Sequence, residues 1–159
     1  MNKEFYKGID YLKKNNDIAY LINEMEIPHF PIETGHFKSL IKFIIYQQLS
    51  IKSARKIYDR LIDLFENKEI NPRNFKCLSI IQLQKVGISK PKICYMNEIA
   101  DQFIQNDSFL DNIDNLSNQE IINELTKIKG VGPWTSEMFL MFTLQRLDIF
   151  SIKDLGIKK

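Results

Sequence analysis

The apolar residues of this chain recur with the period of an α-helix along nearly its whole length. Over residues 54–65 they stand at i, i+3, i+4, i+7, i+8 and i+11, which places them in one stripe on a helix. Residues 37–45 and 93–104 carry similar stripes. No segment alternates apolar and polar residues convincingly as a half-buried strand would, and no repeat recurs at a fixed solenoid period. This periodicity predicts an all-α fold.

Polar residues and glycines predict where these helices begin and end. The candidate N-terminal caps are Asp17, Ser50, Ser89 and Ser117. Ser117 is followed three residues later by Glu120, which fits the capping box S-x-x-E. Gly87 is a natural residue to end a short helix over about residues 79–85. The polar stretches 67–74 and 105–118 predict loops, the second as a connection between helices and not as a domain boundary.

Length and composition limit the classes of protein that remain. The chain has 159 residues, so we expect a single domain over residues 1–159. Lys and Arg number 22 against 20 Asp and Glu, a balance that by itself does not predict nucleic-acid binding. Two cysteines are too few for a four-thiolate iron–sulfur cluster or a Cys-rich zinc site. Residues 1–10 carry no apolar leader and no stretch reaches the ~20 apolar residues of a membrane span, so we expect an intracellular, cytoplasmic or nucleoid-associated protein with no membrane partner.

The most informative segment is residues 125–138, which read LTKIKGVGPWTSEM. A helix ends, a turn follows at Gly130, Val131 and Gly132, and Pro133 opens a second helix. Glycines permit positive φ and close backbone approach, and free amides at a helix N-terminus can bind a phosphate. The pattern fits the hairpin of a helix–hairpin–helix element over about residues 119–144, which grips DNA backbone without reading sequence. Taken alone, an ordinary tight turn between helices remains the alternative.

Three further segments agree with this one in the right order. Residues 43–54 (FIIYQQLSIKSA) resemble the pattern h-h-x-Q-Q-h-S-x-x-x-A, residues 87–96 (GISKPKICYM) resemble G-h-S-x-x-K-x-x-Y-h, and residues 150–156 (FSIKDLG) carry an aspartate. Together with the hairpin, they make the chain similar to the helix–hairpin–helix DNA glycosylase superfamily, in the branch of DNA-3-methyladenine glycosylase II. The resemblance runs from about residue 8 to the last residue.

The resemblance implies a function and a partner. It implies a base-excision repair enzyme that hydrolyses the N-glycosidic bond of alkylated purines, of the 3-methyladenine type, in double-stranded DNA. We expect such an enzyme to work as a monomer, without an iron–sulfur cluster or other cofactor. Two alternatives stay open: a truncated, catalytically impaired DNA-binding module of the same fold, and an endonuclease III-like glycosylase/lyase.

Asp154 is the candidate catalytic residue. The family usually shows two adjacent acids, of which the second is catalytic, and here Lys153 and Asp154 occupy these positions. N-glycosidic cleavage passes through an oxocarbenium-like state, which one carboxylate can stabilise while it orients or deprotonates water. A helix N-cap is the alternative role for Asp154. Asp148, the other nearby acid, is expected to be solvated or to cap a helix.

Trp134 separates the hydrolytic from the lyase branch. Bifunctional relatives of the endonuclease III type place a nucleophilic lysine at this position, so the resemblance implies a monofunctional glycosylase. The indole can stack on an extruded cationic base, with about 0.5–2 kcal/mol of cation–π attraction. Packing in the core is the alternative. Met138, one turn further on, is a candidate for the same base pocket, although core packing is the favoured interpretation.

The remaining candidate residues concern DNA. Gln47 and Gln48 lie between two apolar segments, where their amides could fill the gap left by an extruded nucleotide; Gln48 matches the wedge position of the family. A helix-capping or interhelical amide is the alternative. The resemblance also implies a monovalent cation that bridges the backbone carbonyls of Thr126, Ile128 and Val131 to a DNA phosphate. His29 and His36 have no partner at metal-ligand spacing, and Cys77 and Cys94 are expected to be inert thiols.

The C-terminal end of the sequence leads to a further expectation. Five residues follow Asp154, whereas the resemblance implies several further helices that hold the aspartate and close the base pocket. A terminal segment is prone to fraying, and a loosely held carboxylate loses catalytic value. The hairpin lies between two helices that are both present. We therefore expect this chain to bind DNA better than it excises bases.

Overall fold

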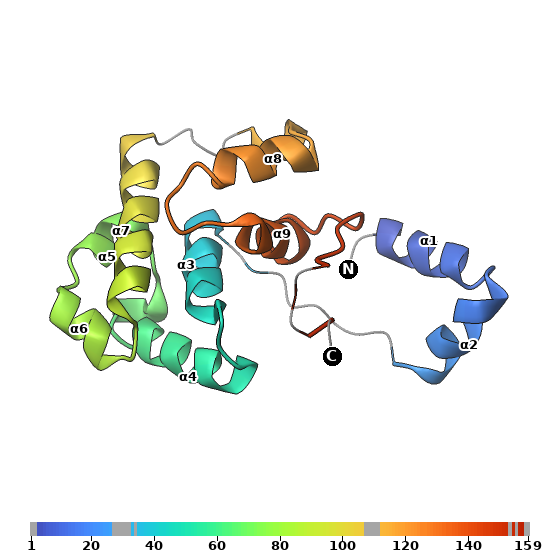
Figure 1. Cartoon of the computed structure of the whole chain (residues 1–159), viewed down its shortest axis with the longest axis horizontal. Coiled ribbons are helices and arrows are strands. Elements are labelled where there is room, and N and C mark those ends of the chain that lie inside the picture. The colour runs from blue at the N-terminus through green and yellow to red at the C-terminus, as the bar shows by residue number, and fades with distance from the viewer. Residues whose placement is uncertain are drawn as a thin grey trace. The chain divides into compact units, whose positions relative to one another are not determined.

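A computed structural model describes residues 3–26, 33, 35–106, 112–152, 154 and 156–157. These residues form nine α-helices and two short 3-10 helices, and no strand is found among them. The all-α prediction is therefore confirmed for the described part of the chain (Figure 1). The chain divides into two compact units, residues 1–31 and residues 32–159.

The first unit contains α1 (Lys3–Leu12) and α2 (Asn16–Glu24). The prediction that Asp17 caps α2 is wrong, because Asn15 is the cap and its Oδ1 accepts a hydrogen bond from the Asp17 amide at 2.9 Å. Asn15 has the extended backbone that a cap requires, with φ −91° and ψ 115°. Asp17 instead lies in the first turn, where its charge is favourable beside the positive end of the helix dipole.

The second unit contains the candidate site, and its described residues form seven α-helices. They are α3 (His36–Tyr46), α4 (Ile51–Ile62), α5 (Pro72–Lys76), α6 (Ile80–Lys85), α7 (Lys90–Gln105), α8 (Asn118–Leu125) and α9 (Pro133–Phe142). The 3-10 helices η1 (Glu66–Lys68) and η2 (Ile113–Asn115) lie in connections. The loop predicted over residues 67–74 is partly wrong, because α5 begins at Pro72. The signal that sequence reasoning missed is a capping box made of two asparagines, Asn71 and Asn74.

The core of this unit forms around α3, which packs against α4, α7 and α9 and lies between α7 and α9 in Figure 1. Its residues Leu40, Ile41, Ile44 and Ile45 are all 0% exposed. Each such side chain contributes about 1.5–3 kcal/mol by leaving water. A central helix buried on most of its surface fixes the position of its own C-terminal turn, which carries Gln47 and Gln48.

Most of the predicted helix ends are confirmed. The Ser50 hydroxyl caps α4, and Ser117 forms a reciprocal capping box with Glu120 at the start of α8. Gly87 ends α6 with φ +104°, a value at which a side chain would be strained. Ser89 precedes α7 as predicted, but its hydroxyl makes no capping hydrogen bond.

Candidate active site and DNA interface

The hairpin between α8 and α9 has one position that requires glycine. Gly130 has φ +90°, and a Cβ atom there would lie 2.0 Å from Cγ of Tyr95 on α7. Gly132 is the N-cap of α9 at φ −99°, and a Cβ atom there would meet nothing within 4 Å. Its carbonyl accepts hydrogen bonds from the amide and the hydroxyl of Ser136, both at 3.1 Å. The turn is thus shaped by Gly130 and left uncrowded at Gly132, where α9 begins.

The turn after α3 is hydrogen-bonded to this hairpin. The Gln47 side-chain Nε2 donates to the Gly130 carbonyl and to the Thr135 hydroxyl, both at 2.9 Å. From α7, Lys92 Nζ donates to the carbonyls of Ile45 at 2.8 Å and Gln47 at 2.7 Å. Partial burial lowers the pKa of Lys92. The side-chain amide of Gln47 therefore has the interhelical role that was the alternative to DNA contact. Lys92 supports the same turn, and sequence reasoning did not assign it.

Gln48 differs from its neighbour. It is exposed, has φ +56°, and its side chain makes no hydrogen bond to any residue that the structure describes. A non-glycine residue with positive φ is uncommon and is found mainly at turns and functional sites. The side chain of Gln48 is thus available to a ligand, whereas Nε2 of Gln47 is already used. Its role as the wedge residue stays a prediction.

The structure brings Trp134 and Asp154 into direct contact. The indole Nε1 of Trp134 donates to Asp154 Oδ2 at 2.7 Å, and the Gly156 amide donates to Asp154 Oδ1 at 2.7 Å. Both side chains are half-buried. The contact with the amide two residues further on is that of an Asx turn. The described residues after Asp154 form no helix, so the role of Asp154 as a helix N-cap stays a prediction. Trp134 does not simply fill the core, because its N–H group binds the candidate catalytic residue.

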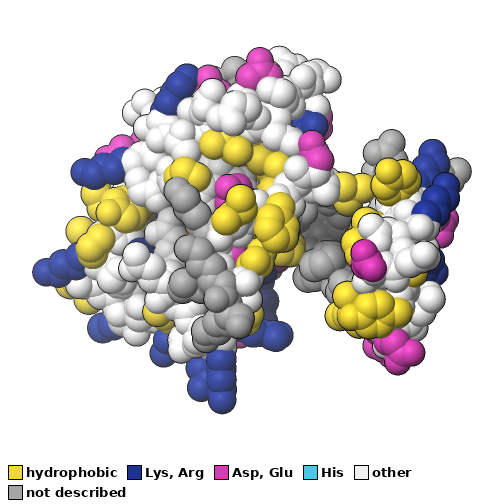
Figure 2. All heavy atoms as spheres, turned by 45° about the vertical axis from the view of Figure 1, so that its right-hand side comes forward, with side chains coloured by type: hydrophobic (Ala, Val, Ile, Leu, Met, Phe, Trp, Pro, Cys, Tyr) yellow, Lys and Arg dark blue, Asp and Glu magenta, His cyan; other side chains and the backbone are white. Residues whose placement is uncertain are grey.

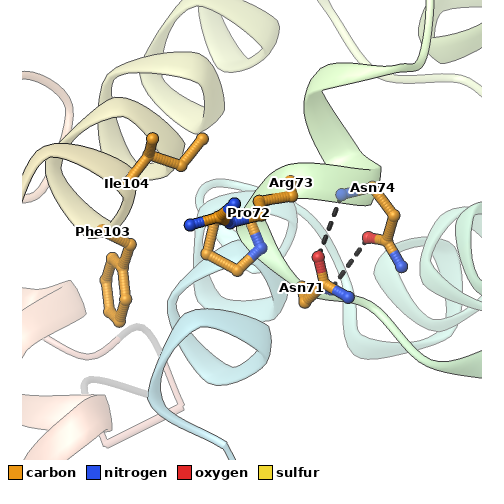
Figure 3. Close-up of a pocket in the computed structure, with 6 residues that line it drawn as sticks. All are labelled: Asn71, Pro72, Arg73, Asn74, Phe103 and Ile104. Carbon is orange, nitrogen blue, oxygen red and sulfur yellow. Dashed lines mark hydrogen bonds between the residues drawn. The ribbon is translucent and has the colours of Figure 1, made fainter. Parts of the chain in front are cut away.

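Met138 is 8% exposed and belongs to the hydrophobic core, so the favoured interpretation of core packing is confirmed. Its predicted place in a base pocket stays a prediction. Two cavities of the described structure lie elsewhere. One of about 350 Å³ is formed by residues at the start of α5 and the end of α7 (Figure 3), and contains none of the predicted site residues. One of about 130 Å³ lies beside Lys92 and Leu49.

Sequence reasoning missed one pair of residues close to the aspartate. The Ser151 hydroxyl donates to Oε2 of Glu137 on α9. Ser151 is 1% exposed, and Glu137 is half-buried. Glu137 follows Trp134 by three residues and therefore shares its face of α9. That spacing was the one signal in the sequence that could have drawn attention to Glu137.

The carbonyls proposed to hold a cation belong to the turn that connects α8 to α9. Thr126 is the C-cap of α8, and the Ile128 carbonyl accepts a hydrogen bond from the Val131 amide at 3.0 Å. Each carbonyl oxygen has two lone pairs, so this hydrogen bond leaves the Ile128 oxygen able to accept a further partner. The monovalent cation stays a prediction.

The other candidates have ordinary surroundings. Among the described residues, no group of three or more His, Cys, Asp or Glu side chains could hold a metal ion. The ring of His36 lies 5.6 Å from that of Phe139, and His29 lies outside the described residues. Cys77 and Cys94 are free and exposed, and exposed Asp148 accepts a hydrogen bond from Asn118 Nδ2 at 2.9 Å. No described helix is long and apolar enough to cross a membrane.

Comparison with known proteins assigns this fold and hairpin to a family. Residues 41–159 match the model of the HhH-GPD superfamily base excision DNA repair protein. The chain belongs to this family. It is 32% identical over 156 residues to the DNA-3-methyladenine glycosylase of Saccharomyces cerevisiae, covering 92% of this chain and 51% of the relative. With DNA-3-methyladenine glycosylase 1 of Schizosaccharomyces pombe it shares 33% identity over 124 residues, covering 77% and 54%. The chain thus spans about half the length of these curated relatives.

Solved structures agree with this assignment. The Schizosaccharomyces pombe 3-methyladenine DNA glycosylase Mag1, solved in complex with abasic DNA, matches with a TM-score of 0.85 and 29% identity, covering 95% of this chain and 76% of that one. A DNA-3-methyladenine glycosidase from Bacillus halodurans matches with a TM-score of 0.78 and 32% identity, covering 92% and 68%. The fold of the described residues is therefore that of a helix–hairpin–helix glycosylase.

Proposed function

We propose that the protein is a monofunctional base-excision repair glycosylase that hydrolyses the N-glycosidic bond of alkylated purines, of the 3-methyladenine type, in duplex DNA. The observation that carries the proposal is the contact between Trp134 and Asp154, at 2.7 Å, on the helix that the hairpin opens. Trp134 lies in the first turn of α9, directly after the turn proposed to bind phosphate, and its indole contacts the carboxylate of Asp154 on the segment that follows α9. The names of the relatives support the class of substrate.

Hydrolysis of the N-glycosidic bond of an alkylated purine requires little more from the protein than an oriented carboxylate. Loss of a base leaves positive charge on the sugar, and Asp154 can stabilise that charge and direct a water molecule to the anomeric carbon. Its two oxygens are oriented by the Trp134 indole and the Gly156 amide. An alkylated purine is cationic and is a good leaving group, so a second carboxylate acting as a general acid is not required.

The residue types also favour hydrolysis over lyase chemistry. A Schiff base needs an amine nucleophile at the reacting carbon. Trp134 occupies the lysine position of bifunctional relatives, and the nearby Lys127 is paired with Glu124 at 2.6 Å on the other side of the hairpin turn. The indole offers an aromatic face to a cationic base instead.

The charge distribution supports duplex DNA as the partner. Residues 50–92 contain ten Lys and Arg against four Asp and Glu, whereas the whole chain has 22 against 20. On α4, exposed Lys52, Arg55, Lys56 and Arg60 form no ion pair with another described residue. In Figure 2, Lys and Arg side chains gather along the lower edge, the side on which Figure 1 draws α4. Phosphates neutralise such a face and release counterions.

Two further parts of the proposal concern the hairpin and the wedge. The Gly132 amide would bind one DNA phosphate, whereas the Val131 amide already donates to the Ile128 carbonyl. The carbonyls of Thr126, Ile128 and Val131 would share a monovalent cation with that phosphate. Gln48 would enter the duplex where a nucleotide has left it. We propose that the protein does this as a monomer.

The test is single-turnover excision of a methylated purine from duplex DNA by the parent chain and by Asp154→Asn. We expect the variant to lose about 100-fold or more in rate, as when one charge-stabilising group is removed from an active site. Its affinity for undamaged duplex should change by less than about threefold, because the carboxylate of Asp154 binds no phosphate. Asp148→Asn is the matched control, since Asp148 is an exposed acid near the same segment, and it should keep the parental rate.

Two results would count against the proposal. Excision by Asp154→Asn at the parental rate would remove Asp154 from the reaction. A parent chain that binds duplex DNA but excises no methylated purine would favour the impaired DNA-binding module.

A further inference from the structure

The segment that carries Asp154 is joined to α9 by two side-chain hydrogen bonds. One is donated by Trp134 Nε1 to Asp154 Oδ2 at 2.7 Å, and the other by the Ser151 hydroxyl to Glu137 Oε2. Trp134 and Glu137 are three residues apart, so both partners are on one face of α9. The second hydrogen bond does not touch Asp154 itself, but it holds Ser151, three residues before Asp154, against α9.

Ser151 is the one buried residue among 150–152, 154, 156 and 157, the part of this segment that the structure describes. It is 1% exposed, whereas its neighbours Phe150 and Ile152 are 69% and 71% exposed. Apolar packing of these two neighbours therefore does little to hold the segment. The hydrogen bond of buried Ser151 holds it instead. A buried hydroxyl must find a partner, and Glu137 supplies it.

The backbone transmits this anchor to the aspartate. The Asp154 amide donates to the Ser151 carbonyl at 2.9 Å, a direct hydrogen bond between the backbones of the two residues. A shift of Ser151 would therefore be passed to the backbone of Asp154 through this hydrogen bond. A carboxylate that is misplaced by about 1 Å can lose on the order of 100-fold in rate.

We propose that Glu137, acting through Ser151, is a positioning residue that holds Asp154 against Trp134. This inference rests on the proposed function, in which Asp154 is the catalytic residue. Glu137 contacts neither the base nor the sugar in this role. Its carboxylate accepts one hydrogen bond from a buried hydroxyl, and a hydrogen bond with an ionised acceptor is stronger than one between neutral groups.

The chain contains a reporter for this contact, because Trp134 is its only tryptophan. Indole emission responds to a hydrogen-bonded carboxylate beside the ring. Asp154→Ala defines the emission spectrum of Trp134 without its partner. We expect Ser151→Ala and Glu137→Ala to shift the spectrum toward that reference, and Glu137→Gln to stay close to the parent because an amide oxygen can still accept the hydrogen bond.

The kinetic expectation is a loss in the chemical step without a loss in binding. Ser151→Ala and Glu137→Ala should lower the single-turnover excision rate about 10- to 100-fold while the affinity for duplex DNA stays within about twofold. Glu137→Gln should restore most of the rate. The double variant should lose no more than either single variant, because both remove the same hydrogen bond.

Ser39→Ala is the matched control for loss of a buried serine. Ser39 is 0% exposed and its hydroxyl donates one hydrogen bond, to the Gly35 carbonyl at 3.0 Å, at the start of α3. It should change neither the emission spectrum nor the excision rate. An equal loss of rate in Ser39→Ala would reveal a general effect of destabilisation and would overturn the proposal.

The proposal is also overturned if Ser151→Ala keeps the parental emission, or if it shifts the emission and keeps the parental rate. These results are distinct from failure of the proposed function. If Asp154→Asn excises at the parental rate, the catalytic assignment falls. The emission of Ser151→Ala then still decides whether Ser151 holds Asp154 against the indole.

Discussion

Replacing either hairpin glycine by alanine adds the same methyl group in two different environments. At Gly130 the backbone has φ +90°, and the new Cβ would lie 2.0 Å from Cγ and 2.5 Å from Cβ of Tyr95. At Gly132 the backbone has φ −99°, and no atom lies within 4 Å of the new Cβ. The two variants therefore form a matched pair, which distinguishes a steric requirement for glycine at one position from a general effect of replacing glycine in the hairpin.

The magnitudes follow from these geometries. A left-handed backbone costs a non-glycine residue about 1–2 kcal/mol, and overpacking a side chain against a fixed neighbour costs about 1–3 kcal/mol. Gly130→Ala should therefore lower the free energy of unfolding by about 2–5 kcal/mol. Gly132→Ala gains from reduced unfolded-state entropy and loses some cap preference, so it should stay within about 1 kcal/mol of the parent.

The assay is equilibrium unfolding in urea, followed by the emission of Trp134, for the parent, both single variants and Gly130→Ala in a Tyr95→Ala background. Tyr95→Ala removes the contact at 2.0 Å with Cγ but keeps the Cβ atom at 2.5 Å, so the cost of Gly130→Ala should fall and still exceed its backbone part of about 1–2 kcal/mol. Equal free energies of unfolding for Gly130→Ala and Gly132→Ala would refute the reasoning. So would a cost at Gly130 that does not depend on Tyr95.

Four shorter predictions concern the remaining features of the site. Because residue 134 is Trp and not Lys, borohydride should trap no covalent protein–DNA adduct and the products should be intact abasic strands; a trapped adduct on a denaturing gel would favour the lyase branch. Neutralising Lys56 and Arg60 together should reduce the slope of log K against log salt by up to about 0.9 for each phosphate that these residues neutralise, whereas neutralising Lys13 and Lys14 of the first unit should leave the slope unchanged. Lys92→Met should lower the free energy of unfolding by about 1–3 kcal/mol, measured in urea, because two carbonyls at the end of α3 lose their donor. Hydrogen bonds from Ser117 lower the pKa of Glu120 from its usual 4.5. The ionised carboxylate of Glu120 therefore stabilises the fold above pH 4.5, and this contribution is lost as the pH falls through the lowered pKa. The difference in melting temperature between the parent and Glu120→Gln should disappear in acid.

Short-range signals explain which parts of the fold could be predicted from the sequence. The capping box of Ser117 and Glu120, the cap at Ser50 and the helix end at Gly87 each depend on residues within one turn of each other. The error at α2 arose because two nearby polar residues could both cap, and only the backbone conformation of Asn15 decides between them. Local sequence patterns therefore predict features that depend on hydrogen bonds within a single helix or at its ends.

The site depends on contacts that no local pattern contains. The hydrogen bond from Gln47 to the Gly130 carbonyl joins residues 83 positions apart, and the approach of Tyr95 to Gly130 joins α7 to the hairpin. The order of the motifs predicted that Trp134 and Asp154 belong together, but their hydrogen bond is a property of the folded chain. Ser151 was overlooked because a single serine between two apolar residues matches no sequence pattern that predicts a buried hydrogen bond.

These long-range contacts give a physical reason why separate segments of the sequence occur together. Gln47 comes from the first segment, Lys92 and Tyr95 from the second and Gly130 from the hairpin, and each contacts another member of the set. A side chain larger than hydrogen at position 130 would displace Tyr95, and a shift of α7 would move the lysine that holds the Gln47 carbonyl. The turn that carries Gln48 and the turn proposed to bind phosphate are therefore held in a fixed relation, which the proposed contacts of both turns with one DNA duplex would require.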